Sequence, residues 1–305
     1  MLRLPDHWVW DHWFLPTAAE SHLFFLRASR ALQDPDRRHQ RAAIGHAVRG
    51  PGGDWELVSD ALVHADEPAF DSRACWTGSA LELPDGRVRL FYTGVSAAEN
   101  GTVQRIGWAD SLDGRTFDRV APAALEADPR WYEADPAAAG EVHWRDPFVF
   151  AGDDGLWHML ITARSREGEV AGRGVVGHAV SRDLDTWEVQ PPLTDPAGFW
   201  HLEVCQQFVE DGQHWLLFSC PQSQVPEASR TPGGSEIWVA RGDSALGPWD
   251  IAGARPVGPS DYYAGQALRD ADGTLMLSGF RNIVDGQFLG EVGPPVPLLL
   301  PSSTD

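Results

Sequence analysis

A strand–turn–strand unit recurs along this chain, and it restricts the possible folds more than any other feature. Each copy places Asp-Gly between two runs rich in β-branched and aromatic residues, which predicts a β-hairpin because such turns need positive φ angles. The turns are Asp85-Gly86, Asp154-Gly155, Asp211-Gly212 and Asp272-Gly273. A further pair of strands accompanies the hairpins, in which a small-residue strand leads through a polar turn to an aromatic residue. These pairs run from Ile44 to Trp55, Ile106 to Phe117, Val176 to Trp187 and Ile237 to Trp249.

Four short strands in a repeated unit are typical of a β-propeller blade. Counting the units along the sequence gives five, of which the first and last are less regular, as terminal repeats often are. We therefore predict an all-β chain that forms a five-bladed β-propeller with four antiparallel strands per blade, as a single domain over residues 1–305. The expected blades are residues 7–58, 75–120, 144–190, 201–251 and 260–292. Residues 293–305 are expected to form a tail along the surface.

Charge and cysteine content restrict the partners and the compartment. The chain has 44 acidic and 24 basic residues and a formal net charge of −20. Nucleic acids and anionic membrane surfaces are disfavoured as partners, because neutralising phosphates needs clustered basic residues. The first residues lack the apolar segment of a signal peptide, and no apolar run is long enough to span a bilayer. Cys75, Cys205 and Cys220 are scattered and odd in number, which favours a reduced compartment, so we expect a cytoplasmic protein.

Three acidic residues stand among aromatic or apolar neighbours at the start of separate repeat units. Asp11 lies between Trp10 and Trp13, Asp146 precedes an apolar run, and Glu203 lies between apolar residues. Each of them alone could be an ordinary solvated residue. A propeller, however, gathers the first strand of every blade around its axis, so we expect these carboxylates to converge at one mouth of the axial channel. Like charges gathered so closely are typical of a functional site.

The residue types at this site fit the cleavage of a glycosidic bond. In that reaction one carboxyl group protonates the leaving oxygen, and another attacks the anomeric carbon or activates water. The 14 tryptophans support a sugar ligand, since flat indole rings stack on the C–H faces of sugars. Arg145 and Asp146 stand side by side at the open end of a strand, and Pro147 biases Asp146 towards an extended conformation. The polar segment from Gln33 to Arg41 is expected to be a loop at the binding rim.

The runs around these acids resemble motifs of the β-fructosidase superfamily, glycoside hydrolase families 32 and 68, whose fold is a five-bladed propeller. Trp10-Asp11-His12-Trp13 is similar to the family 68 nucleophile run Trp-Asp-Ser-Trp-Pro, and Trp76-Thr77-Gly78-Ser79-Ala80 to its Trp-Ser-Gly-Ser-Ala run. Arg145-Asp146-Pro147 matches a motif that both families share. Glu203-Val204-Cys205 stands in the place of Glu-Cys-Pro or Glu-Arg-Pro, and Tyr262-Tyr263-Ala264-Gly265-Gln266 resembles a late family 32 run. The ordered set covers nearly the whole chain and is far more specific than any one motif.

This resemblance implies a role for each acid. Asp11 would be the nucleophile, Glu203 the general acid/base, and Asp146 the residue that holds the fructosyl hydroxyls in the transition state. The substrate-binding residues implied are Trp10, Trp13, Trp76, Thr77, Arg145, His201 and Tyr263. The reaction would retain configuration through a covalent fructosyl-enzyme, without a metal or an organic cofactor. The expected substrate is sucrose or a small fructoside, with hydrolysis of the fructosyl bond and transfer of fructose to acceptors as alternative outcomes.

The sequence also departs from the family patterns. The Asn-Asp-Pro-Asn-Gly run of family 32 is absent around Asp11, and Val204 and Cys205 replace the residues that follow the catalytic Glu. His201 stands where family 68 has an acidic residue, in a region that contacts the leaving sugar or acceptor. No C-terminal β-sandwich of the family 32 type is expected, which brings the architecture nearer to family 68.

Two other functions fit the same residues. One is a related five-bladed enzyme that cleaves arabinofuranosides with inversion, for which the two carboxyl groups are about 6.5–9.5 Å apart rather than the about 5–5.5 Å of retaining enzymes. The other is a non-catalytic sugar-binding propeller, which gives no reason for three convergent acids. The 11 histidines show no zinc-protease spacing, so the sequence predicts no catalytic metal.

Overall fold

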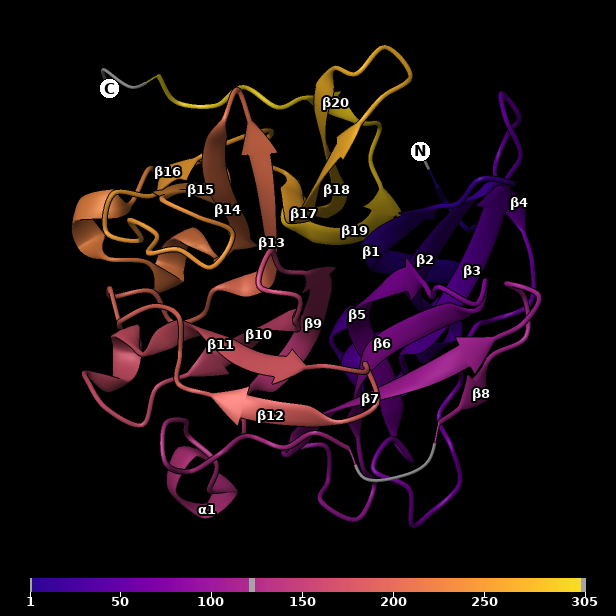
Figure 1. Ribbon diagram of the computed structural model, residues 1–305, viewed down its shortest axis with the longest axis horizontal. Coiled ribbons are helices and arrows are strands. Elements are labelled where there is room, and N and C mark those ends of the chain that lie inside the picture. Colours follow the sequence, from indigo (N-terminus) through magenta and orange to yellow (C-terminus); the bar gives the residue numbers. More distant parts are fainter. Residues whose placement is uncertain (1, 121–123, 303–305) are drawn as a thin grey trace.

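Antiparallel sheets surround a central axis in the computed structural model, which describes residues 2–120 and 124–302 (Figure 1). They follow one another in chain order, and the first strand of each lies nearest the axis, which confirms the predicted five-bladed β-propeller. The first blade contains β1 (His7–Pro16), β2 (Ser21–Ser29), β3 (Ala43–Arg49) and β4 (Glu56–Leu57). The second contains β5 (Ala74–Glu82), β6 (Val88–Val95), β7 (Gln104–Ser111) and β8 (Asp118–Arg119). The third contains β9 (Trp144–Ala151), β10 (Trp157–Arg164), β11 (Gly174–Ser181) and β12 (Trp187–Gln190). The fourth contains β13 (Glu203–Glu210), β14 (Gln213–Ser219), β15 (Ile237–Gly242) and β16 (Arg255–Pro256).

The fifth blade is less regular, as the sequence predicts. It contains β17 (Tyr262–Arg269), β18 (Leu275–Val284), β19 (Gln287–Val292) and β20 (Val296–Pro297). Both β19 and β20 pair with the same side of β18, so together they take the place of one interrupted third strand. The sheet therefore continues beyond the boundary expected at residue 292, and Leu298 is buried against blades four and five.

The N-terminal segment joins the last blade to the first. The backbone N–H of Leu2 donates to the carbonyl of Val292 at 3.1 Å, and the N–H of Val292 donates back at 3.0 Å. Leu2 and Leu4 then pack with Val9 and Phe25 in the core between blades five and one. Figure 1 shows the N-terminus beside β19. Pairing of distant parts of the chain thus closes the ring without leaving a free sheet edge at this point.

The hydrophobic core lies between the blades rather than within them. In the described residues, buried apolar side chains form one cluster at each junction of neighbouring blades. Large fully buried rings such as Trp144 and Trp238 fill two of these junctions. Because side chains alternate between the faces of a strand, each sheet buries both faces, one against each neighbour. The Asp-Gly hairpin prediction is also confirmed, since Gly86, Gly155, Gly212 and Gly273 all have positive φ angles.

Helical segments are short and lie in the connections. They are η1 (Arg30–Leu32), η2 (Pro35–Arg41), α1 (Pro136–Ala139), η3 (Val170–Gly172), η4 (Gln222–Gln224) and η5 (Glu227–Ser229). The segment from Gln33 to Arg41, expected as a loop, therefore contains a 3₁₀ helix, which Asp34 caps by accepting from the N–H of Asp36 at 3.0 Å. A helix that crosses a bilayer must be long and apolar. None of the helices in residues 2–120 and 124–302 is long and apolar enough.

Two buried histidine pairs occupy equivalent places in blades one and three. His22 Nδ1 lies 3.0 Å from His46 Nε2, and His158 Nδ1 lies 3.0 Å from His178 Nε2. In both pairs the rings are stacked nearly parallel. A hydrogen bond between two imidazoles needs one unprotonated nitrogen, so the contact is lost when both rings are charged. Burial lowers the pKa of His46 to about 3 and that of His178 to about 4.

These pairs predict a loss of stability in acid. Below the ordinary histidine pKa of 6.5, the unfolded chain binds protons that His46 and His178 do not bind in the folded chain. The contribution of the pairs to stability is therefore complete above pH about 6.5 and falls as the pH drops towards about 4. A His46→Gln, His178→Gln variant should show a weaker fall of Tm between pH 6.5 and pH 4 than the wild type. His64→Gln, at an exposed histidine, is the control. An unchanged slope in the double variant would contradict this account.

Candidate active site

A β-bulge interrupts the innermost strand of every blade at the level of the predicted site. At each bulge the inner strand carries one residue more than the strand paired with it. The bulges fall at Trp10-Asp11, Thr77, Asp146-Pro147, Val204-Cys205 and Ala264-Gly265. A bulge bends the strand and changes the direction of a side chain. The repeated bulges therefore turn the site residues of separate blades towards the same end of the axial channel.

Hydroxyl groups tie most of these bulges to the preceding blade. In blades two to five, a Ser or Thr on the second strand hydrogen-bonds to the inner strand of the next blade. Thr93 Oγ1 accepts from the N–H of Asp146 at 2.9 Å, and Thr162 Oγ1 accepts from the N–H of Val204 at 3.2 Å. Ser219 Oγ accepts from the N–H of Gly265 at 3.4 Å, and Ser278 Oγ lies 2.7 Å from His12 Nε2. These bonds fix the positions of the blades, and hence of the site residues, relative to one another.

Asp146 has a left-handed backbone, with a φ angle of 57°. The extended conformation expected from Pro147 is therefore wrong at this residue, because the bulge imposes a tighter turn that Asp tolerates better than most residues. The carboxylate accepts from Thr162 Oγ1 at 2.8 Å and lies 3.3 Å from Arg145 Nε. The pKa of Asp146 is raised to about 7, chiefly by burial and also by the charges of Asp11 and Glu203, while Arg145 and Thr162 oppose the rise.

Asp11 accepts a hydrogen bond from Thr77 Oγ1, so the first and second blades meet at this carboxylate. The pKa of Asp11 is raised to about 6, chiefly by burial and also by the charge of Glu203, while the hydrogen bond from Thr77 opposes the rise. Gly78 makes the contact possible, because a Cβ atom there would lie 1.8 Å from the carbonyl oxygen of Phe91. A side chain at Gly78 would push β5 away from β6 and displace Thr77.

Glu203 has two proton donors at its carboxylate. Arg145 Nη2 donates to Oε1 and Tyr263 donates its hydroxyl to Oε2. Its apolar neighbours in sequence, Leu202 and Val204, thus do not form the surroundings of the carboxyl group. Burial and the charge of Glu203 raise the pKa of Tyr263 well above its ordinary value, so the phenol stays a donor.

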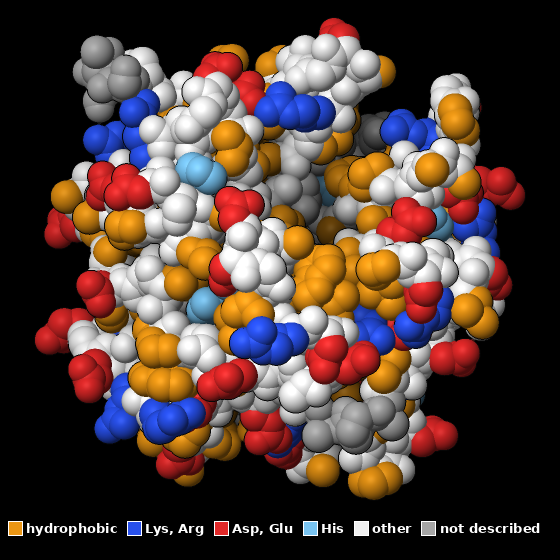
Figure 2. Space-filling model, viewed as in Figure 1, with side chains coloured by type: hydrophobic (Ala, Val, Ile, Leu, Met, Phe, Trp, Pro, Cys, Tyr) orange, Lys and Arg blue, Asp and Glu red, His pale blue; other side chains and the backbone are white. Residues whose placement is uncertain are grey.

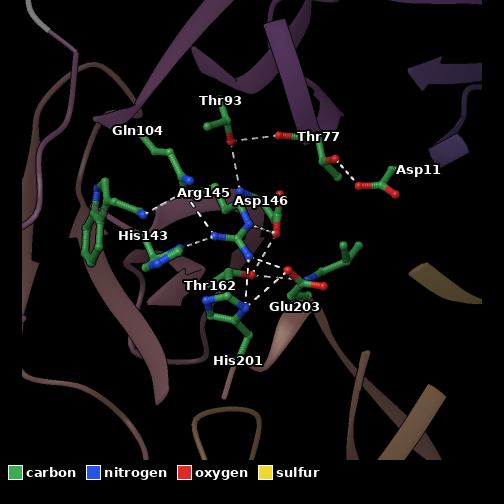
Figure 3. Close-up of polar contacts among 12 residues, drawn as sticks. Asp11, Thr77, Thr93, Gln104, His143, Arg145, Asp146, Thr162, His201 and Glu203 are labelled. Atoms are coloured by element: carbon green, nitrogen blue, oxygen red, sulfur yellow. Dashed lines mark hydrogen bonds and ion pairs between the residues drawn. The ribbon is translucent and has the colours of Figure 1, made fainter. Parts of the chain in front are cut away.

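Arg145 lies at the centre of the polar network in Figure 3. Its Nη1 donates to Gln104 Oε1 at 3.1 Å and lies 3.0 Å from His143 Nδ1. His201 Nδ1 lies 3.4 Å from Arg145 Nη2 and 3.5 Å from Glu203 Oε1. His201 is 7% exposed, and its Nε2 has no hydrogen-bond partner among the described residues. Burial and nearby Arg145 lower the pKa of His201 well below its ordinary value, so the ring is neutral.

The structure thus brings together Asp11, Asp146 and Glu203, as predicted: the charge of Glu203 acts on Asp11, and the charges of Asp11 and Glu203 act on Asp146. Thr77, Arg145, His201 and Tyr263 also contact this group. Two expected substrate-binding residues are placed differently. Trp13 is 2% exposed and stacks on Phe24 with ring centroids 6.0 Å apart, so its ring belongs to the core.

Trp10 is also 2% exposed, because the 3₁₀ helix η2 covers it. Arg38 lies over its ring at 5.6 Å, and His39 meets its edge at 6.1 Å. Trp76 is less buried and donates its indole N–H to the carbonyl of His39 at 2.7 Å. Sequence reasoning placed the 33–41 segment at the rim but did not identify Arg38 as part of the site. It also missed Gln104, His143 and the hydroxyls of Thr93 and Thr162.

A cavity of about 850 Å³ borders the bulges. Its walls include bulge residues such as Pro147 and Val204 and residues that follow the bulges in all blades, among them Phe14, Ser79, Phe148, Gln206 and Ala267. Asp146 is among the residues that line this cavity, whereas Asp11 and Glu203 are not. The face shown in Figure 2 is hollowed near its centre, where the innermost strands of Figure 1 converge. Over the part of the chain that is described, no group of three or more His, Cys, Asp or Glu side chains could hold a metal ion.

A propeller with three convergent carboxylates, one of them bound by Arg and Tyr, defines the class of glycoside hydrolase-like five-bladed propellers. Comparison of the sequence with models of protein families identifies the family of this chain. The model of the Glycosyl hydrolases family 32 N-terminal domain matches residues 22–288, and the chain belongs to this family. Asp11 lies just before the matched range.

Individual relatives agree with this assignment. The sucrose-6-phosphate hydrolase of Klebsiella pneumoniae is 27% identical over 286 residues, which are 90% of this chain and 56% of that protein. A beta-fructofuranosidase of Arabidopsis thaliana, insoluble isoenzyme CWINV6, is 30% identical over 58% of this chain and 30% of its own length. The chain thus spans about half the length of the first relative and less of the second. The inulosucrase from Halalkalicoccus jeotgali bound to kestose has the same fold, with a TM-score of 0.78 at 23% identity over 99% of this chain and 88% of that one.

Proposed function

We propose that this protein is a retaining glycoside hydrolase that cleaves the β-fructofuranosyl bond of sucrose or of a small fructoside. The observation that carries the proposal is the convergence of Asp11, Asp146 and Glu203 from β1, β9 and β13 (Figure 3). Only Glu203 among them contacts both an arginine and a phenol. The names of the relatives, a sucrose-6-phosphate hydrolase and a beta-fructofuranosidase, support a fructosyl substrate.

The first step forms a covalent intermediate. A carboxylate oxygen of Asp11 attacks C2 of the fructosyl unit, and the bond from C2 to the glycosidic oxygen breaks. Glu203 gives its proton to that oxygen, so the leaving sugar departs as an alcohol. Thr77 orients the attacking carboxylate through its hydrogen bond. Asp146, held by Thr162 and Arg145, binds the hydroxyls of the fructosyl ring.

The second step releases the sugar. Water gives a proton to Glu203 and attacks C2, the ester bond to Asp11 breaks, and two inversions leave the configuration unchanged. If a sugar hydroxyl replaces water, fructose is transferred to an acceptor. Arg145 and Tyr263 hold Glu203 between the two steps, since they contact opposite oxygens of the carboxylate. We also propose a cytoplasmic location, which the three buried free cysteines support.

The proposal predicts fructose release from sucrose, sucrose 6-phosphate, raffinose or a short fructo-oligosaccharide. The purified protein would be tested on all of them and on an aryl arabinofuranoside, with the first-formed anomer followed by NMR. Fructose in the β form would support a retaining fructosidase, and the order of rates would identify the leaving sugar. Release of arabinose with inversion would replace the proposal with the arabinofuranosidase alternative. Sugar binding without any product would replace it with a sugar-binding propeller.

A further inference from the structure

Arg38 projects from η2 into the wall of the site, where its charge is poorly paired. The side chain is 11% exposed, and among the described residues the only carboxylate within 4.0 Å is that of Asp36, at 3.8 Å and 94% exposed. Ion pairs with such an exposed partner contribute little to the stability of the fold. Arg38 Nη1 donates to the carbonyl of Pro35 at 2.9 Å, and its buried Nε has no hydrogen-bond partner in the described part of the chain. A buried cation left this incompletely paired is unfavourable for folding.

The surrounding contacts hold the guanidinium in one place. Its Cζ lies 3.8 Å from the ring centre of Phe288 in β19 and 5.6 Å from that of Trp10 in β1. The same helix is tied to blade two, because His39 accepts from Trp76 Nε1 at 2.7 Å and Gln40 accepts from Arg73. Thus η2 spans blades five, one and two. The guanidinium is thus attracted to two aromatic faces, and one of them belongs to Trp10, the residue directly before Asp11 in β1.

The two arginines of the site, Arg38 and Arg145, act on different carboxylates. Arg145 lies within 4.0 Å of both Glu203 and Asp146. Asp11 has no such ion pair within residues 2–120 and 124–302, and the hydroxyl of Thr77 holds its carboxylate. Arg38 is the cation whose charge opposes the effect of burial on Asp11, and Asp11 in turn favours the charged form of Arg38.

We propose that Arg38 is a positioning residue of this site, which keeps the carboxylate of Asp11 ionised. This inference rests on the proposed function of Asp11 as the nucleophile, and it makes η2 a working part of the site. A nucleophile must be ionised to attack, yet Asp11 lies near two other carboxylates that resist its charge. Arg38 supplies the opposite charge from its place between the rings of Trp10 and Phe288.

The charged and titratable groups that face Asp11 come from several elements. They are Arg38 on η2, Glu203 on β13 and Asp146 on β9, beside the hydroxyl of Thr77 on β5. Glu203 and Asp146 favour protonation of Asp11, and Arg38 favours its ionisation. Removing Arg38 alone therefore moves the balance towards the protonated form.

The test follows the ionisation of Asp11 directly. The full chain would be labelled at the aspartate carboxyl carbons and titrated by NMR, with the Asp11 signal identified by its absence in Asp11→Asn. We expect a midpoint near pH 6 in the wild type. In Arg38→Met the midpoint should rise by about one pH unit, since an opposite charge nearby shifts a carboxyl group by about one to three units. Arg38→Lys should keep a midpoint near that of the wild type, and Arg37→Met, at an exposed residue of the same helix, is the matched control.

Activity provides a second measurement that separates this inference from the proposed function. If the wild type cleaves a fructoside, the acid limb of kcat/KM should move upward with the NMR midpoint in Arg38→Met. A shifted midpoint in a protein without any fructosidase activity would uphold the role of Arg38 and overturn the proposed function. An unshifted midpoint in folded Arg38→Met would overturn the role of Arg38, even if activity falls. Should Arg38→Met fail to fold, Arg38→Gln gives the same reading, since it also removes the charge.

Discussion

Replacement of Asp11 by Asn is expected to lower the rate of fructosyl cleavage by about 10⁴-fold or more, as the loss of a nucleophile does in other hydrolases. The amide can still accept the hydrogen bond from Thr77, so the shape of the site is retained. It cannot form the ester with C2, and the reaction then lacks its first step. The measurement is kcat for sucrose or for the best fructoside found among the substrates.

The same substitution should leave the fold at least as stable as before. Burial raises the pKa of Asp11 from 3.8 to about 6, so between these values the folded chain holds a proton that the unfolded chain has released. Stability therefore falls as the pH rises through this window and stays lower at neutral pH. Asn has no charge to bury, so the variant does not lose this stability at neutral pH. Its Tm at pH 7.5 should rise by about 2–4 °C for each kcal/mol gained in the free energy of unfolding.

This pair of outcomes separates a chemical role from a structural one. Loss of activity together with a higher Tm supports Asp11 as the nucleophile. Loss of activity together with a lower Tm at neutral pH would show that the carboxylate holds the site together instead. Asp6→Asn is the control, because Asp6 is exposed and its side chain contacts the neighbouring His7. Both kcat and Tm should be unchanged in that variant.

Convergence of the three acids could be predicted because it follows from the repeat. Asp11, Asp146 and Glu203 each stand near the start of an inner strand, and a propeller gathers those strands at its axis. The hydroxyls that bind the bulges could also have been found in this way. Thr93 and Thr162 occupy the same position in the second strands of blades two and three, and both contact Asp146. The signal lies in the alignment of the repeats rather than in either residue alone.

Other features depend on contacts that no local pattern records. The left-handed backbone of Asp146 follows from the bulge, whereas the sequence showed only the opposing preference set by Pro147. Trp13 stands in a run typical of a ligand site, whereas its stacking on Phe24 depends on the pairing of β1 with β2. Arg38 stands in a charged segment that is typical of a solvated loop. Only the packing of η2 against Phe288, which is distant in the chain, reveals its position.

Replacement of Glu203 by Gln should have an effect that depends on the leaving group. With sucrose the rate should fall by about 10²–10⁴-fold, because the departing oxygen no longer receives a proton. With β-fructosyl fluoride the first step should remain close to that of the wild type, since fluoride leaves without protonation. The fructosyl-enzyme should then accumulate, because no base activates the attacking water, and azide should restore turnover by attacking as an anion.

Dependence on the leaving group is what distinguishes a general acid/base from a residue that merely orders its neighbours. The side-chain amide in Glu203→Gln has one acceptor oxygen, which could still accept from Arg145, while its NH2 group could donate to the hydroxyl of Tyr263; both contacts would be weaker than those of a carboxylate. If Glu203 served only to position these two residues, both substrates would slow by the same factor and azide would have no effect. Glu210→Gln, at the far end of the same strand, removes an ion pair with Arg269 and should change neither rate. Restored turnover with azide would then assign proton transfer to Glu203 itself, because no other carboxyl group among the described residues shares its contacts with both Arg145 and Tyr263.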